Sequence, residues 1–278
     1  MSQSNGEITP FEAPSAGGSA LHGQIDGEGN DIVLLHGLTA TRRNVVQGSR
    51  LLARQGARLM AFDARGHGES EPAPDARAYE YRDLVADLES VLGAVGAERP
   101  VLAGSSMGAA TAMAFALDQP DRVRALVQIT PAYDGAPRAD DLDHWDSLAE
   151  ALDREDVEAF VDRSGANDLP ERLREGARLA TRQRIERHRH LAAVADALRV
   201  TPRSTAFEGL GLLEGLDIPV LVVGSRDESD PGHPLAVAQE YARRLPRAEL
   251  VVEEPEKAPL AWQGAQLSRA IAEFLAQL

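Results

Sequence analysis

Short apolar runs alternate with segments of helical periodicity along most of the chain. The apolar runs predict buried parallel strands, and they span residues 31–37, 57–63, 100–104, 124–130 and 218–224. Between them, apolar residues recur every three or four positions, which predicts helices over residues 43–55, 79–95 and 106–118. Strands and helices that alternate in this way predict a parallel sheet covered by helices on both faces.

The two ends of the chain continue this pattern. Near the N-terminus, two short strands are expected at Glu7–Glu12 and Ser19–Ile25, separated by a glycine turn. Near the C-terminus, helices are expected over residues 234–245 and 264–275, on either side of a strand at residues 248–253. The predicted fold class is therefore α/β, with one mostly parallel, twisted sheet.

Residues 131–210 interrupt the alternation of strand and helix. This segment contains no apolar run typical of a buried strand, and it is charged and helical in pattern. Its candidate packing positions are Leu148, Leu152, Val157, Phe160, Leu173, Ile185, Leu191, Val194 and Leu198. We therefore expect a core domain of residues 1–130 and 211–278 and a helical cap of residues 131–210. The cap would cover the C-terminal edge of the sheet, where open α/β folds bind ligands.

Composition narrows the classes of partner. The formal net charge is −15, so the surface repels nucleic acid and anionic membranes, and a small-molecule substrate is the expected partner. The chain has no cysteine, which excludes disulfides, thiolate metal sites and a cysteine nucleophile. Its N-terminus lacks the pattern of a signal peptide, and no apolar run reaches the ~20 residues of a membrane helix. We expect a cytoplasmic protein, and its oligomeric state is left open.

The clearest chemical motif is Gly104-Ser105-Ser106-Met107-Gly108, between a predicted strand and a predicted helix. A serine on such a sharp turn is held in a strained backbone conformation with its hydroxyl exposed. Glycines two residues to either side leave room for the turn. The N-terminus of the following helix directs its free amides toward any oxyanion that forms. The pattern therefore predicts a nucleophilic serine at Ser106.

Three further motifs accompany the serine turn. His36-Gly37 ends an apolar strand, and Asp63–Ser70 reads DARGHGES after the next strand. Gly224–Asp227 follows the strand after the helical segment, with a proline four residues on. Together with the serine turn, these motifs resemble those of the α/β-hydrolase fold superfamily, and the chain looks like a serine esterase with a cap insert. The resemblance covers essentially the whole sequence.

The resemblance implies a role for each matching residue. Ser106 would be the nucleophile, and the backbone amides of Leu38 and Met107 would form the oxyanion hole. Asp227 would be the acid that orients a catalytic histidine. Structural roles, with rings hydrogen-bonded to loops around the oxyanion turn, are implied for His36 and His67.

The chain departs from the family where the catalytic histidine is expected. That histidine normally follows the last strand, but here the stretch is Val251–Pro259, and Lys257 occupies the position. No histidine lies beyond His233. Neighbouring glutamates and Asp227 stabilise an ammonium and raise its pKa, whereas a base at neutral pH needs a pKa of about 7–8. Lys257 is therefore expected to be an ion-pair partner rather than the base.

His233 is the main candidate for a relocated base. It follows the acid turn on a loop that contains Gly232 and should border the cleft. A catalytic triad is defined by geometry and not by chain position, so Asp227 or Asp230 would orient the His233 ring. Because no second cluster of ligands accompanies these three side chains, no metal is expected. No cofactor is expected either.

The remaining histidines receive other roles. His144 and Trp145 lie in the cap segment and are expected to bind substrate, although His144 stays an alternative base. His188 and His190 belong to an arginine-rich run, so they are expected on a solvated helix face.

These features predict a hydrolase of ester or acyl substrates, similar to carboxylesterases but with a non-standard base. Two alternatives to this prediction stay open. One is a ligand-binding protein that kept the pocket and lost the base, and the other is a C–C hydrolase or lyase that uses the same pocket. A histidine within hydrogen-bond reach of Ser106 would favour the hydrolase.

Overall fold

One sheet runs through the molecule. The computed structural model describes residues 7–136, 142–226, 232–254, 262 and 265–278. In this part of the chain the strand order is β1-β2-β4-β3-β5-β6-β7-β8. The strands are β1 (Thr9–Pro14), β2 (Ala20–Asp26), β3 (Asn30–Leu35), β4 (Ala57–Phe62), β5 (Val101–Ser105), β6 (Ala125–Ile129), β7 (Val220–Gly224) and β8 (Ala248–Val252).

The sheet is parallel except at one edge. β1 pairs with β2 and β2 with β4 in antiparallel fashion, and all the other neighbouring strands pair in parallel. The apolar runs are therefore the interior strands, as predicted. Their side chains alternate between two cores: Val33 and Leu35 of β3 contribute to one, and Ile32 and Leu34 to the other.

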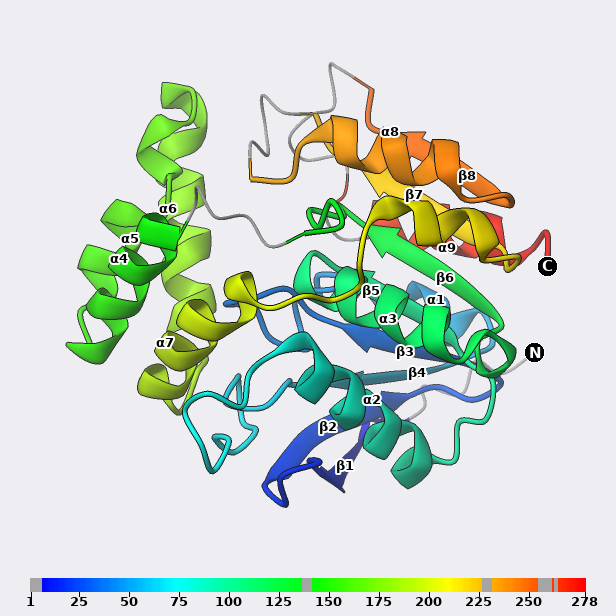
Figure 1. Cartoon of the computed structure of the whole chain (residues 1–278), viewed down its shortest axis with the longest axis horizontal. Helices are drawn as coiled ribbons and strands as arrows, with labels where there is room; N and C mark the ends of the chain where they lie inside the picture. Colours follow the sequence, from blue (N-terminus) through cyan, green and yellow to red (C-terminus); the bar gives the residue numbers. More distant parts are fainter. Residues whose placement is uncertain (1–6, 137–141, 227–231, 255–261, 263–264) are drawn as a thin grey trace.

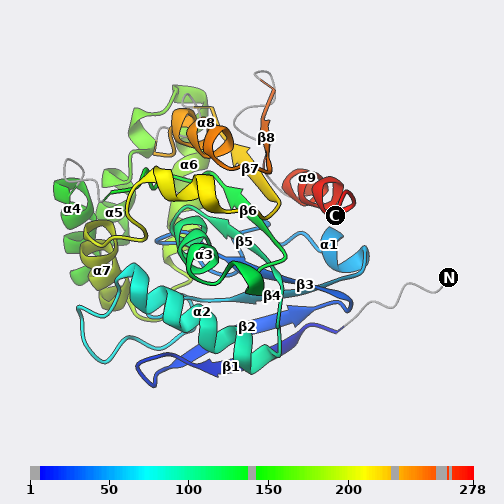
Figure 2. The ribbon, with the colours of Figure 1, turned by 45° about the vertical axis from the view of Figure 1, so that its right-hand side comes forward.

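Helices cover both faces of the sheet (Figures 1 and 2). One core holds buried side chains of α2 (Tyr81–Val95), α3 (Met107–Asp118) and α8 (Leu235–Arg244). The other holds Leu52 of α1 (Leu51–Arg54) and the apolar face of α9 (Ala265–Leu275). The predicted α/β fold class, with helices on both faces, is confirmed.

A third group of helices lies at one end of the sheet, on the left of Figure 1. It comprises α4 (Leu142–Asp153), α5 (Val157–Arg163), α6 (Glu171–Ile185) and α7 (Leu191–Val200). These helices have a separate apolar core, which includes the predicted packing positions Leu148, Leu152, Phe160, Ile185, Val194 and Leu198. The helical character predicted for this part of the chain is therefore present.

The prediction of a helix over residues 43–55 is wrong for most of its length. Only Leu51–Arg54 is helical, and the preceding residues form turns. Gln47 and Gly48 have positive φ values of 51° and 72°, which are incompatible with a right-handed helix. Val45, Val46 and Leu52 are buried together. These apolar residues are buried by a series of compact turns rather than by one face of a helix, and their spacing in the sequence does not distinguish the two.

Candidate active site

Ser106 lies at the junction of β5 and α3, in the conformation that the serine motif predicts. Its φ of 51° and ψ of −111° lie outside the regions favoured by residues with a Cβ, which costs roughly 1–3 kcal/mol. The backbone N–H of Ser106 donates to the Ile129 carbonyl oxygen at 3.1 Å, and the Ser106 carbonyl accepts from Ala110 N–H at 3.0 Å. Hydrogen bonds to both sides of the turn thus hold the strained residue.

Two glycines allow the turn to pack closely. A Cβ on Gly104 would overlap the Gly108 backbone, and a Cβ on Gly108 would overlap the Leu35 carbonyl. The first residue of α3, Met107, is therefore drawn close to the end of β3. The loop that follows β3 carries Leu38, so the two backbone amides expected in an oxyanion hole belong to adjoining segments.

His36 fixes one peptide of that loop. Its Nε2 accepts from Ala64 N–H at 2.9 Å, so its Nδ1 carries the proton and donates to the Gly37 carbonyl oxygen at 2.8 Å. Gly37 and Leu38 share a planar trans peptide, in which C=O and N–H point in opposite directions. A fixed Gly37 carbonyl therefore also fixes the direction of the Leu38 amide.

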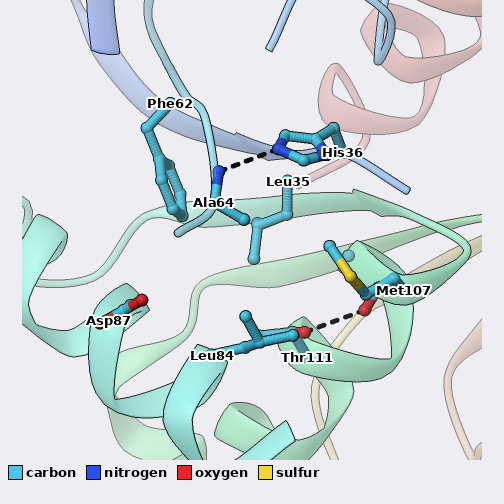
Figure 3. A pocket seen from close by; sticks show the side chains of 9 residues that line it. Leu35, His36, Phe62, Ala64, Leu84, Asp87, Met107 and Thr111 are labelled. Atoms are coloured by element: carbon cyan, nitrogen blue, oxygen red, sulfur yellow. Dashed lines mark hydrogen bonds between the residues drawn. The ribbon is translucent and has the colours of Figure 1, made fainter. Parts of the chain in front are cut away.

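A cavity of about 20 Å³ lies behind this turn, which is room for roughly one water molecule. Figure 3 shows its lining, with His36 bonded to Ala64 on one side and the Thr111 hydroxyl donating to the Met107 carbonyl on the other. The Thr111 bond, at 2.9 Å, holds the first turn of α3. The lining is mostly apolar, so the cavity offers no second polar site.

Three buried histidine rings contact one another behind the loop that follows β3. The ring centroids of His36 and His67 are 5.2 Å apart, and those of His67 and His188 are 5.5 Å apart. His188 is only 7% exposed, so its predicted place on a solvated face is wrong. The ring is buried, unlike the charged side chains next to it in the sequence, because both ring nitrogens form hydrogen bonds with backbone groups of the core. These groups are the Gly68 N–H at 2.8 Å and the Thr39 carbonyl at 3.0 Å.

Burial disfavours the protonated form of all three imidazoles. Burial lowers the pKa of His36, although Asp63 opposes the shift. Burial and the two neighbouring imidazoles lower the pKa of His67 far more. Burial lowers the pKa of His188 to about 4. Since His36 and His188 use both ring nitrogens on backbone groups, neither is placed to act as a base at Ser106.

The His188 shift predicts a loss of stability in acid. Its pKa falls from 6.5 to about 4 on folding, so between these pH values the unfolded chain binds more protons. His188 therefore lowers the free energy of unfolding as pH falls from 6.5 to about 4, by roughly 3 kcal/mol in all, and the loss levels off below. We expect urea unfolding of His188→Gln to depend less on pH in this window than that of wild type. An unchanged pH dependence would contradict the assignment, and His190→Gln is the matched control.

Ser106 opens onto a much larger cavity, of about 860 Å³. Its walls come from the strand ends and from α4, α5 and α6. Six of the predicted site residues line it: Leu38, Ser106, Met107, His144, Trp145 and His233. The sequence therefore identified residues that are far apart in the chain and share one cavity. Asp227, Asp230 and Lys257 lie outside the described residues.

His233 and His144 approach this cavity from different elements. His233 precedes α8 and is partly buried, whereas His144 is exposed at the start of α4, where its ring contacts that of Trp145 edge-on, with the ring centroids 5.4 Å apart. Both therefore line the cavity into which Ser106 opens.

Two site residues were missed by the sequence analysis. Glu253 is 3% exposed, and its Oε1 accepts from the Ser225 hydroxyl at 3.1 Å and from Arg226 N–H at 2.7 Å. It thereby holds the two residues that directly follow β7. Trp262 lines the cavity and donates from Nε1 to the Gly224 carbonyl at 3.0 Å. Neither belongs to a motif, so only the packing of the strand ends identifies them.

Within the described ranges, no group of three or more His, Asp or Glu side chains is placed to hold a metal ion. None of the helices in this part of the chain combines the length and apolar character needed to cross a membrane.

The alpha/beta hydrolase fold family matches residues 31–265, which is most of the chain. The protein therefore belongs to this family.

Curated relatives match the chain over different lengths. An sn-1-specific diacylglycerol lipase of Mus musculus is 40% identical over 99 residues, covering 35% of this chain and 31% of the lipase. Epoxide hydrolase B of Mycobacterium tuberculosis is 34% identical over 122 residues, covering 42% and 34%. The match thus spans about a third of the length of these relatives. A putative 2-succinyl-6-hydroxy-2,4-cyclohexadiene-1-carboxylate synthase of Bacillus subtilis is 26% identical and covers 89% of this chain and 90% of its own.

Solved structures share the fold along nearly the whole chain. A thermophilic esterase from Thermogutta terrifontis has a TM-score of 0.77 and 23% identity, covering 97% of this chain and 98% of its own. The enol-lactonase from Burkholderia xenovorans has a TM-score of 0.75 and 20% identity, covering 96% and 100%. The bottromycin epimerase BotH has a TM-score of 0.70 and 22% identity, covering 97% and 100%. At these identities the likeness concerns the fold alone.

Proposed function

We propose that the protein is a serine hydrolase that cleaves ester or acyl bonds at Ser106. The observation that carries the proposal is the strained Ser106 at the N-terminus of α3, which lines an 860 Å³ cavity together with Leu38 and Met107. Relatives named as a lipase and an epoxide hydrolase, and structural neighbours that include an esterase, support hydrolysis as the reaction class.

The proposed reaction has two steps. Ser106 Oγ attacks the carbonyl carbon while a base takes the hydroxyl proton, and the oxyanion accepts hydrogen bonds from the amides of Leu38 and Met107. Collapse expels the alcohol, which takes the proton from the base, and leaves an ester on Ser106. Water then attacks this acyl group by the same route, and the acid product leaves with Ser106 restored.

His233 is the base that we propose. It lines the same cavity as Ser106, in the turn before α8, and it precedes no further histidine in the sequence. Asp227 or Asp230 would orient its ring, because both acids precede it by a few residues. Lys257 keeps the role of an ion-pair partner.

The helices α4 to α7 are proposed to form a cap of residues 131–210 on a core of residues 1–130 and 211–278. Trp145, Leu148 and Phe160 of this segment line the cavity, so it would select a small to medium, mostly apolar acyl substrate. His144, beside Trp145, is proposed to contact the polar part of that substrate.

A second candidate function is ligand binding, or a C–C hydrolase or lyase reaction, in the same cavity. It is favoured by Lys257, which stands where the family has its catalytic histidine. The epimerase among the structural neighbours supports this candidate, because the same fold there carries a different reaction.

A fluorophosphonate that reacts only with activated serines distinguishes the two candidates. The hydrolase predicts a covalent adduct on Ser106, located by peptide mass spectrometry, together with turnover of a short-chain activated ester between about pH 6 and 9. The neighbouring Ser105 is the internal control and should stay unmodified. Absence of both the adduct and the turnover would overturn the hydrolase and favour the second candidate.

Substitution of the two candidate bases assigns the proton transfer. We expect His233→Ala to lower kcat by about 10³-fold or more, because loss of the base resembles loss of the nucleophile. Lys257→Ala should change kcat by less than about threefold, since an ion-pair partner takes no proton. Steady-state hydrolysis of the same ester measures both. The opposite result, with Lys257→Ala inactive and His233→Ala active, would make the lysine the base.

A further inference from the structure

The connection between α6 and α7 is joined to the core by three hydrogen bonds that meet at two loops. His188 Nδ1 accepts from Gly68 N–H at 2.8 Å, and Arg189 N–H donates to the Gly68 carbonyl at 3.0 Å. Both backbone groups of Gly68 are therefore bound by consecutive residues of this connection. Because the His188 Nδ1 is an acceptor, its Nε2 carries the proton and donates to the Thr39 carbonyl at 3.0 Å.

Thr39 is a residue whose conformation needs such support. Its φ is 71°, in the left-handed region that β-branched side chains rarely occupy. It directly follows Leu38, whose amide is the proposed oxyanion donor. A turn bond from Ala40 N–H to the Gly37 carbonyl, at 3.0 Å, closes the loop on one side. The His188 bond holds the Thr39 carbonyl on the other.

The residues on either side of Leu38 are Gly37 and Thr39, and the carbonyl of each accepts a hydrogen bond from a buried imidazole. His36 holds the Gly37 carbonyl and His188 holds the Thr39 carbonyl. His36 directly precedes the loop, whereas His188 belongs to the helical segment and lies 149 residues after Thr39 in the chain. The side chain is 7% exposed and packs edge-on against His67, so its position is fixed from several sides.

We infer that His188 is a positioning residue for the oxyanion hole: it holds Thr39 in its strained conformation and, together with His36, keeps the loop of residues 37–40 and its Leu38 amide in place. The helical segment thereby takes part in catalysis without touching the reacting atoms. The inference rests on the proposed function, because the oxyanion hole is part of it.

Two substitutions separate hydrogen bonding from packing. His188→Gln keeps an acceptor and a donor on one side chain, whereas His188→Leu fills similar space with neither. We expect His188→Leu to lower kcat for an activated ester by about 10- to 100-fold, less than the 10²–10³-fold of a deleted oxyanion donor, because the Leu38 amide is misdirected and not removed. KM should stay within about threefold, because the side chain does not contact substrate. His188→Gln should recover most of the lost kcat.

A second measurement tests the stability of the loop of residues 37–40 and does not depend on turnover. Amide hydrogen exchange of the peptide that contains residues 37–40 should be faster in His188→Leu than in wild type, and near the wild-type rate in His188→Gln. His190→Gln is the matched control, because this side chain lies two residues away and takes no part in the three bonds. If His188→Leu does not fold, His188→Asn replaces it: its shorter amide can meet Gly68 but not Thr39, so it should also exchange faster and turn over more slowly.

The outcomes distinguish this inference from the proposed function. Equal losses of kcat in His188→Gln and His188→Leu would make the residue a packing element and overturn the inference. So would wild-type exchange of residues 37–40 in His188→Leu. If wild type itself shows no turnover that depends on Ser106, the proposed function fails, while the exchange experiment still decides whether His188 holds the loop.

Discussion

Ser106→Ala is expected to lower kcat for a short-chain activated ester by about 10³- to 10⁶-fold. The reason is chemical: without Oγ no acyl-enzyme forms, and only binding and the backbone amides of Leu38 and Met107 remain to accelerate attack by water. Those amides persist because they are main-chain groups. Stopped-flow or steady-state measurement of the release of the coloured alcohol gives kcat for both proteins. Titration with the fluorophosphonate gives the concentration of active wild-type enzyme.

Ser105→Ala is the matched control for that experiment. Ser105 directly precedes Ser106, is partly buried and lines the same cavity. Its substitution should leave kcat within a few-fold of wild type. If Ser106→Ala retains the wild-type rate, the turnover comes from another nucleophile and the role of the serine turn is refuted.

Gly108→Ala is expected to destabilise the protein by about 4 kcal/mol or more, or to displace α3 from the sheet. The added methyl group would overlap the Leu35 carbonyl and lie 2.8 Å from the His36 carbonyl oxygen. All of these are backbone atoms of β3 and the loop after it, so no side chain can rotate away. Movement of α3 would also shift Ser106 and the Met107 amide. Urea unfolding followed by circular dichroism gives the change in the free energy of unfolding.

Gly93→Ala provides the control for added bulk at a helical glycine. Gly93 lies in α2, and a Cβ there meets no atom within 4 Å. Alanine should therefore stabilise the helix by roughly 0.5–1 kcal/mol. A similar, small effect of both substitutions would show that the close approach of α3 to β3 is not required.

Most of the fold was predictable because its strands are buried on both faces. Such strands need apolar side chains at successive positions, and runs such as Val220–Gly224, which is buried throughout, are therefore visible in the sequence. The serine turn was predictable for a related reason. Close backbone contacts require glycine at positions 104 and 108, so the geometry of the turn can be recognised from the residues of the motif.

His188 could not be predicted in the same way. Its neighbours in the chain are arginines and glutamate, which indicate a solvated surface, and its ring is buried only because the α6–α7 connection meets two loops of the core. Contacts between segments so distant in sequence produce no periodic pattern of apolar residues from which they could be predicted. Glu253 was missed for the same reason: its partners Ser225 and Arg226 belong to the neighbouring strand end.

The two tryptophans of the chain, Trp145 and Trp262, both line the large cavity. They come from different parts of the chain, Trp145 from α4 and Trp262 from the segment between β8 and α9. Fluorescence excited selectively in tryptophan, at wavelengths that tyrosine does not absorb, therefore originates at the walls of this cavity. The wild-type chain thus carries a built-in optical reporter of occupancy, with which candidate substrates and products can be ranked by affinity before any reaction is known, without a label.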